Sequence, residues 1–172
     1  MNFELAVQSL VDAGVDFIVI GGWSAILHGS AQVTNDLDIF FSRNPENLRR
    51  LARALAPYHP RLRDLPEDPP FLWDVKTLAA NTILTLMTDI GAIDLLSEVS
   101  GLGPFESVKA DAVQVSAFGR RILTLDLRSL IKSKQSAARL KDLNALRELE
   151  SLLEAEDSET PGPPADEDNH GP

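Results

Sequence analysis

Asp36 and Asp38 are separated by a single leucine in the stretch NDLDIFF. On a β-strand, side chains two residues apart share one face, and their Cα atoms lie roughly 6.5 to 7 Å apart. Carboxylates at that spacing can bind a common pair of hard cations, which prefer oxygen ligands. A half-exposed strand also alternates polar and apolar residues without any metal. The stretch therefore predicts a strand over 36–41 with Leu37 and Ile39 facing the core, and it has two explanations: a metal site or ordinary alternation.

A glycine pair precedes these aspartates. Gly21 and Gly22 directly follow the apolar stretch VDFIVI, which predicts a buried strand over 15–20. Glycines let the backbone turn without a Cβ clash and bring bare amides against an anion at the start of a following helix, here predicted over 23–28. A plain strand-ending turn is the commoner use of such a pair. Ser24 could donate its hydroxyl to a phosphate or cap the helix. The position of the glycines before Asp36 and Asp38 favours phosphate binding.

A third aspartate comes from a predicted hairpin. Residues 81–87 are rich in β-branched side chains, and the apolar segment 92–96 follows the turn Thr88–Gly91. This hairpin would place Asp94 on a strand beside the one that carries Asp36 and Asp38, with Ile93 and Leu95 on the opposite face. Thr34 could support the site by a hydrogen bond to the Asp36 carboxylate, or could satisfy a loop. Three carboxylates on one sheet face strengthen the metal-binding interpretation.

These motifs resemble the nucleotidyltransferase superfamily, which has a polymerase-beta-like fold, and in particular its small prokaryotic AbiEii-like members. Asp94 falls on the third acidic position of that family, and KQSAARLKDLNAL resembles its C-terminal K-x4-R-x-K-D pattern. Gln32, Ala138 and Leu140 depart from the family pattern, where arginine, glycine and proline are expected. The N-terminal match comprises Gly21, Gly22, Ser24, His28, Gly29, Thr34, Asp36 and Asp38, and the C-terminal match comprises Lys134, Arg139, Lys141 and Asp142.

The resemblance implies a cofactor and a role for each motif. Two Mg²⁺ ions, or Mn²⁺ in their place, would be held by Asp36, Asp38 and Asp94, with Asp94 on the metal nearer the acceptor. Gly21, Gly22, Ser24, Lys134 and Arg139 would bind the nucleotide, with Lys134 on the β- or γ-phosphate as a compact point charge. Lys132 is the substitute for Lys134 if the register of the motif differs, and His28 is expected to be structural.

The implied reaction moves a nucleoside monophosphate from a nucleoside triphosphate to an acceptor hydroxyl. Relatives include toxins of toxin-antitoxin systems that modify tRNA, and enzymes that modify protein tyrosines or aminoglycosides, so the acceptor and an antitoxin partner stay open. The departures at Gln32 and 138–140 leave a non-catalytic nucleotide-binding partner protein as an alternative. A metal-dependent glycosyltransferase also uses Asp-x-Asp, but the chain is short for that class, and such an enzyme would leave Lys134 unexplained.

Composition bounds the organisation of the chain. With 172 residues, 44% of them hydrophobic, it can bury one sizeable core, so one domain is expected over 1–153. Cysteine is absent, which excludes disulfides and thiolate zinc sites. The first residues lack the basic region of a secretory signal, and the uncharged run 17–27 is shorter than the roughly 20 residues of a membrane helix. A cytoplasmic protein without a membrane partner is expected.

Charge is distributed unevenly along the chain. The net charge is -10, but residues 154–172 contain seven acidic residues and no lysine or arginine, and this acidic, proline-containing tail is expected to be disordered. Half of all lysines and arginines lie within 120–147, which fits either an anion-binding patch or a solvated helical face. The basic residues of that segment are Arg120, Arg121, Arg128, Lys132, Lys134, Arg139, Lys141 and Arg147.

The remaining pattern predicts an α/β (α+β) fold, a small mixed β-sheet flanked by helices. Helices are expected over 3–13, 45–55, 127–138 and 141–153, and a second hairpin over 112–117 and 121–125. Asn44 and Asp126 are predicted N-caps, and Pro45 suits the first helical position. The segment 57–70 holds five prolines and is predicted to be an irregular connection.

Overall fold

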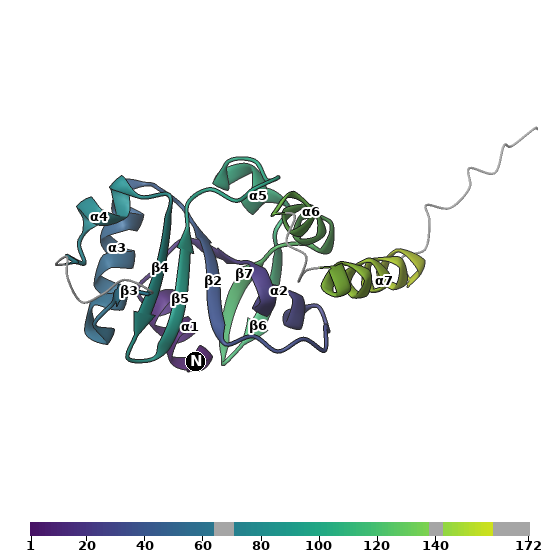
Figure 1. The fold of residues 1–172 in the computed structure, drawn as a ribbon, viewed down its shortest axis with the longest axis horizontal. Helices are drawn as coiled ribbons and strands as arrows, with labels where there is room; N and C mark the ends of the chain where they lie inside the picture. The colour runs from purple at the N-terminus through teal and green to yellow at the C-terminus, as the bar shows by residue number, and fades with distance from the viewer. Residues whose placement is uncertain (64–70, 138–142, 160–172) are drawn as a thin grey trace, which may run out of the picture.

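The computed structural model describes residues 1–63, 71–137 and 143–159. A seven-stranded mixed sheet in the order β3-β4-β5-β2-β1-β7-β6 forms the centre of the molecule (Figure 1). Its strands are β1 (Phe17–Val19), β2 (Asp36–Phe41), β3 (Arg61–Leu62), β4 (Ile83–Thr88), β5 (Gly91–Leu96), β6 (Val113–Ala117) and β7 (Arg120–Thr124).

The middle of the sheet combines both kinds of strand pairing. β2 pairs antiparallel with β1 on one side and parallel with β5 on the other. β4 and β5 form one antiparallel hairpin and β6 and β7 a second, which joins β1 through a parallel pairing of β7. β2 therefore has backbone pairing along both of its edges. This pairing fixes the position and the face of each side chain that β2 carries.

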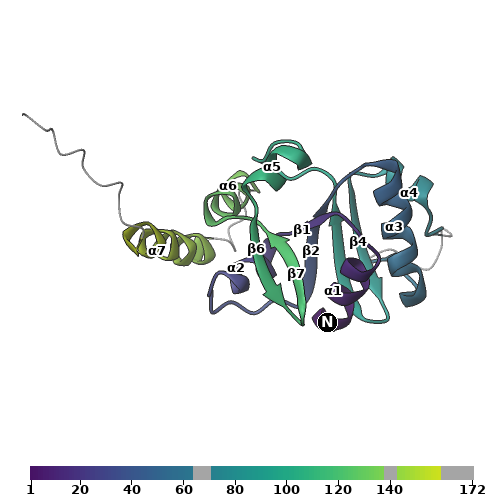
Figure 2. The same cartoon turned by 180° about the vertical axis from the view of Figure 1, so that it is seen from behind.

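Helices pack on both faces of the sheet. The helices are α1 (Phe3–Asp12), α2 (Gly21–Leu27), α3 (Pro45–Leu55), α4 (Val75–Ala80), α5 (Phe105–Asp111), α6 (Leu127–Ala137) and α7 (Leu143–Glu159). One core cluster joins α1, α3 and α4 to residues such as Leu37, Ile39 and Leu95. Figure 2 shows α1 and α3 on the near side of the sheet. A second, smaller cluster joins α5, α6 and α7 to Ile18 and Phe40 on the opposite face. Alternate residues of β1 and β2 thus enter different cores, as the period of a strand requires.

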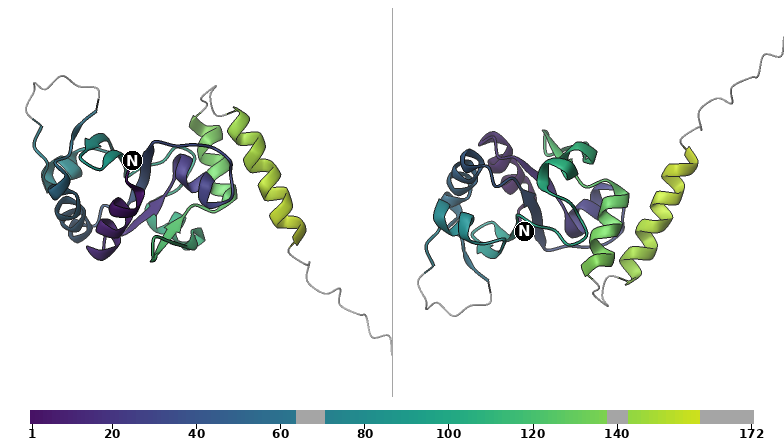
Figure 3. Two further views of the ribbon diagram at one scale, coloured as in Figure 1. Left: turned by 90° about the horizontal axis from the view of Figure 1, so that it is seen from below. Right: turned by 90° about the horizontal axis from the view of Figure 1, so that it is seen from above.

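α7 packs beside α6 at the end of the molecule farthest from α3 and α4 (Figure 3). Leu149 is its fully buried anchor in the second core cluster. One guanidinium nitrogen of Arg128 on α6 donates to both carboxylate oxygens of Asp157. Among the described residues, no helix is long and apolar enough to cross a membrane.

Most predicted elements are confirmed, including the mixed sheet and both hairpins. The strand 36–41 and the helix 45–55 have the predicted bounds, and Asn44 caps that helix by accepting a hydrogen bond from the Glu46 N–H. Asp126 likewise caps α6 by accepting from the Ser129 N–H. These boundaries rest on local signals, namely alternation and capping, which tertiary packing did not override.

Two predictions are wrong in part. The segment 57–70 was expected to be irregular, but a 3₁₀ turn at Ala56–Tyr58 leads into β3, which adds an edge strand to the sheet. Two residues are too few to show strand periodicity in the sequence. β3 forms by pairing with the edge of β4. Disorder was expected from Glu154, but α7 continues to Glu159. α4 and α5 were not predicted either.

Candidate active site

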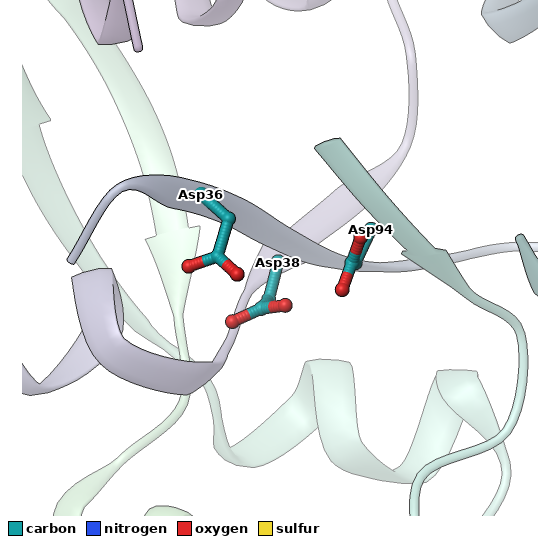
Figure 4. A group of neighbouring side chains, drawn as sticks. All are labelled: Asp36, Asp38 and Asp94. Atoms are coloured by element: carbon teal, nitrogen blue, oxygen red, sulfur yellow. The ribbon is translucent and has the colours of Figure 1, made fainter. Parts of the chain in front are cut away.

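The register between β2 and β5 assembles the three aspartates. Asp38 is the Cα partner of Asp94 in this parallel pairing, and Asp36 lies two residues earlier on the same face of β2. One carboxylate oxygen from each of the three residues lies within 4.8 Å of the others. Figure 4 shows the three side chains directed into the same space from the two strands. The predicted placement of Asp94 on a strand beside the one that carries Asp36 and Asp38 is confirmed.

The same face of β2 is closed at one end and open at the other. Phe40 continues the row of Asp36 and Asp38, but it is buried against Phe105 of α5 in an edge-to-face contact with ring centroids 5.2 Å apart. The carboxylates themselves are half-buried. Leu37 and Ile39, on the other face, are fully buried, as the alternation predicted. The aspartates thus occupy the part of the sheet that helices leave uncovered.

Burial and crowding act most strongly on Asp38. Loss of solvent raises the pKa of Asp38 to about 7, and the neighbouring negative charges of Asp36 and Asp94 add to this shift. A hydrogen bond from the Gly22 N–H and the positive charge of Arg63 oppose it in part. A bound cation would offset the repulsion among these carboxyl groups, so the raised pKa of Asp38 is compatible with cation binding here.

The glycine pair makes room for these carboxylates. Gly21 begins α2 with a φ of +65°, and a Cβ on this residue would overlap the Asp38 carboxylate. A Cβ on Gly22 would meet the Thr34 side chain at 2.9 Å. Gly21 therefore allows the helix start to approach the Asp38 carboxylate closely, and Gly22 allows close approach of Thr34.

Thr34 and Glu148 organise the loop that precedes β2. The Thr34 hydroxyl donates to Asp36 Oδ1 at 2.6 Å, so the predicted supporting hydrogen bond is present. Glu148 of α7 accepts from the Ala31 N–H at 2.7 Å and from the Ser30 hydroxyl at 2.9 Å, and these hydrogen bonds lower the pKa of Glu148. Gln32, the residue that departs from the family pattern, also donates to Glu148.

Arg63 is a site residue that sequence reasoning missed. It follows β3, and its guanidinium pairs closely with Asp94 Oδ1 and lies 3.8 Å from Asp36 Oδ2. The only signal in the sequence was the pair of arginines, Arg61 and Arg63, in the proline-rich segment. Their role depends on β3 joining the sheet, which no local pattern indicated.

A cavity of about 650 Å³ opens in front of the triad. Gly21, Gly22 and Lys134 line it together with the three aspartates, so these predicted residues are brought to one place. Ser24 is not among the lining residues: its side chain is fully buried, and its hydroxyl is hydrogen-bonded to Thr124 Oγ1 at 2.8 Å. His28 bonds the Leu125 carbonyl, which agrees with its expected structural role. Arg139, Lys141 and Asp142 lie outside the described residues.

The donor set fits a hard divalent cation. Asp36, Asp38 and Asp94 offer only carboxylate oxygens, which suit Mg²⁺ and Mn²⁺, and the described residues contain no other group of three such ligands. The Thr34 hydroxyl orients one of the carboxylates, as groups behind metal ligands commonly do.

Comparison with known proteins gives a structural likeness only. No family model matches the chain, and no curated protein matches its sequence. The crystal structure of the lincosamide antibiotic adenylyltransferase LnuA with bound lincomycin is similar, with a TM-score of 0.59 and 15% identity, over 88% of this chain and 98% of that one. A candidate nucleotidyltransferase from Thermotoga maritima has a TM-score of 0.50 and 17% identity, over 87% and 89% of the two chains. The chain therefore has the nucleotidyltransferase fold.

Proposed function

We propose that the protein is a metal-dependent nucleotidyltransferase of the EC 2.7.7 type, which transfers a nucleoside monophosphate from a nucleoside triphosphate, such as ATP, to an acceptor hydroxyl. The observation that carries this proposal is the convergence of Asp36, Asp38 and Asp94 on one open sheet face, with Lys134 lining the same cavity. The likeness in fold to two nucleotidyltransferases supports it.

Each site residue has a proposed part in this reaction. Asp36, Asp38 and Asp94 hold two Mg²⁺ ions, with Mn²⁺ as a substitute, and these ions would neutralise charge on the attacking and leaving oxygens. Lys134, which is half-buried on α6 and lines the cavity, would contact the triphosphate as a point charge. Gly21 and Gly22 let the nucleotide approach the backbone, and Asp94 assists deprotonation of the acceptor. Ser24 has no part in nucleotide binding in this proposal, because its hydroxyl is buried and paired with Thr124.

The acceptor is proposed to be tRNA, a protein or a small hydroxyl compound. One observation favours a compound with an apolar part: Ile83 is 56% exposed, is the register partner of Leu96, and lies with it in the cavity beyond Asp94. LnuA, similar in fold, was crystallised with the antibiotic lincomycin. The basic residues of 120–147 favour RNA instead. A place among AbiEii-like toxins, with an antitoxin partner and a cytoplasmic location, is the biological setting that we infer from the sequence motifs.

The test is a transfer assay with each α-³²P-labelled nucleoside triphosphate, Mg²⁺ and three acceptor pools: bulk RNA, protein extract and a panel of hydroxylated small molecules. Asp36→Asn and Asp94→Asn serve as inactive controls. Label in one pool that requires Asp36, together with released pyrophosphate, supports the proposal and identifies the acceptor class. Transfer that persists in both variants would refute the assigned site.

The second candidate is a non-catalytic partner protein that binds a nucleotide. Gln32 motivates it, because its amide is engaged with Glu148 rather than with the centre of the cavity. Nucleotide binding without transfer to any pool would favour this candidate. The retention of all three carboxylates makes the enzyme the better supported function.

A further inference from the structure

Arg63 continues a row of residues that crosses four strands. The Arg63 N–H donates to the Thr85 carbonyl at 2.9 Å, which extends the β3–β4 pairing by one residue. Thr85 is the register partner of Asp94, and Asp94 is the register partner of Asp38. Because register partners stand side by side on the same sheet face, the backbone of Arg63 is held at a set distance from the triad. The strand pairings of the sheet therefore determine how far the Arg63 side chain must extend to contact the carboxylates.

The guanidinium contacts two of the three carboxylates. It pairs with Asp94 Oδ1 and approaches Asp36 Oδ2 to 3.8 Å. The side chains of Arg63 and Asp94 are only 23% and 17% exposed, so water screens this pair less than it screens a surface ion pair. Arginine, with its fixed fork of donors, can serve two carboxylates together.

These contacts occupy one oxygen in each of two carboxylates that are candidate ligands of a divalent ion. Resting on the proposed function, we propose that Arg63 is a resident counter-cation of the acidic triad, which keeps the metal-free protein stable and must leave Asp94 when a divalent ion binds. The geometry explains how three half-buried carboxylates coexist before the metal arrives, since unpaired charges in such a place are costly. If Arg63 competes with the metal for these carboxylates, its presence lowers the affinity of the protein for a divalent ion, and this effect can be measured.

An alternative role makes the opposite prediction. If Arg63 only oriented Asp94 from behind a metal, its removal would weaken metal binding, as the loss of groups behind metal ligands usually does by roughly 10- to 100-fold. If Arg63 competes with the metal, its removal tightens binding. The direction of the change in affinity therefore separates the two roles.

The experiment is a calorimetric titration of the full chain with Mn²⁺ alone, at fixed pH and ionic strength. Arg63→Gln removes the charge, and Arg63→Lys keeps the charge without the fork. Arg61→Gln is the matched control, because it removes the same charge two residues away, from a side chain that is 62% exposed and faces Asp89. We expect Arg63→Gln to bind Mn²⁺ roughly tenfold more tightly, Arg63→Lys to fall between it and the wild type, and Arg61→Gln to match the wild type.

A second measurement covers the metal-free state and the case in which Arg63→Gln is too unstable to titrate. In EDTA, Arg63→Gln and Arg63→Lys should unfold at lower temperatures than the wild type, and saturating Mn²⁺ should raise their unfolding temperatures by more than it raises that of the wild type. Unchanged or weaker Mn²⁺ binding by both variants would overturn the role of Arg63 while leaving the proposed function intact. Absence of Mn²⁺ binding in the wild type and both variants would overturn both.

Discussion

Asp38 and Asp94 are register partners on the parallel strands β2 and β5, so their carboxylates are held side by side by backbone hydrogen bonds rather than by their own side-chain conformations. In a parallel pairing the hydrogen bonds are evenly spaced, and the side chains of register partners point to the same face of the sheet. Placing these carboxylates together raises the pKa of Asp38, because burial and the two neighbouring carboxylates disfavour its charged form. The stability of the metal-free protein should therefore depend on the ionisation of this one residue.

Asp38→Asn should stabilise the metal-free protein near neutral pH. The folded pKa of Asp38 is about 7 against an ordinary value of 3.8, so folding holds its proton more tightly than the unfolded chain does. The favourable contribution is complete below pH 4 and is lost as pH rises to about 7, where the charged carboxylate costs up to roughly 4 kcal/mol. Urea unfolding in EDTA at pH 5 and pH 8 measures this difference.

In that experiment the wild type should lose more stability between the two pH values than Asp38→Asn does. Asp111→Asn is the control, because it makes the same change at an exposed position at the end of α5. Equal pH dependence of the wild type and Asp38→Asn would show that burial does not disfavour the Asp38 charge.

Gly21→Ala should disrupt the site as well as the backbone. The positive φ of Gly21 costs an alanine roughly 1 to 2 kcal/mol, and the added Cβ would also collide with the Asp38 carboxylate. Gly119→Ala is a matched control, since Gly119 has a φ of +71° but no atom within 4 Å of an added Cβ. In urea unfolding Gly21→Ala should lose more stability than Gly119→Ala, because the collision adds to the backbone strain that both share. Only Gly21→Ala should weaken Mn²⁺ binding, by roughly tenfold or more.

Lys134→Ala and Lys132→Ala should separate two neighbouring cations of α6. Lys134 is half-buried and lines the cavity, whereas Lys132 is exposed and does not line it. Loss of Lys134 should raise the KM for the nucleoside triphosphate by roughly 10- to 100-fold, because a charge-assisted contact with phosphate is lost. Lys132→Ala should leave KM within about twofold of the wild type. Initial rates over a range of nucleotide concentrations provide the comparison, and a larger effect at Lys132 would refute the assignment.

Glu148→Gln should loosen the loop before β2. Glu148 accepts from the Ala31 N–H through one carboxylate oxygen and from Ser30 and Gln32 through the other, whereas an amide has only one oxygen to offer. Hydrogen exchange of the Ala31 amide should therefore become roughly tenfold faster. Glu150→Gln, an exposed position on the same helix, should leave that amide unchanged. Equal exchange in both variants would mean that Glu148 does not restrain the loop.

Local signals account for the parts of the fold and site that could be predicted. Alternation located β2 and the faces of Leu37 and Ile39, and the Asn44–Pro45 pair located the start of α3. The hairpin pattern located β4 and β5, with Asp94 on the face opposite Ile93 and Leu95, because a tight turn leaves few ways for two apolar strands to pair. Each of these features depends on residues close together in the chain.

Other features depend on residues far apart in the chain. β3 forms only where the edge of β4 is available, and with it Arg63 reaches Asp94, 31 residues away. Ser24 was a reasonable phosphate ligand by position, but its pairing with Thr124, 100 residues away, buries it. The acidic run that begins at Glu154 stays helical to Glu159, and within it Asp157 pairs with Arg128 of α6.

The sequence by itself thus determined which residues could bind a metal, on which strands they stand and which face they share, because periodicity and turn chemistry are local. Only the tertiary structure decided which part of that face stays open, how strongly Asp38 resists ionisation, and that Arg63 stands among the carboxylates. The physical reason is that burial, charge and close approach depend on neighbours brought from distant parts of the chain, and no local pattern specifies those neighbours.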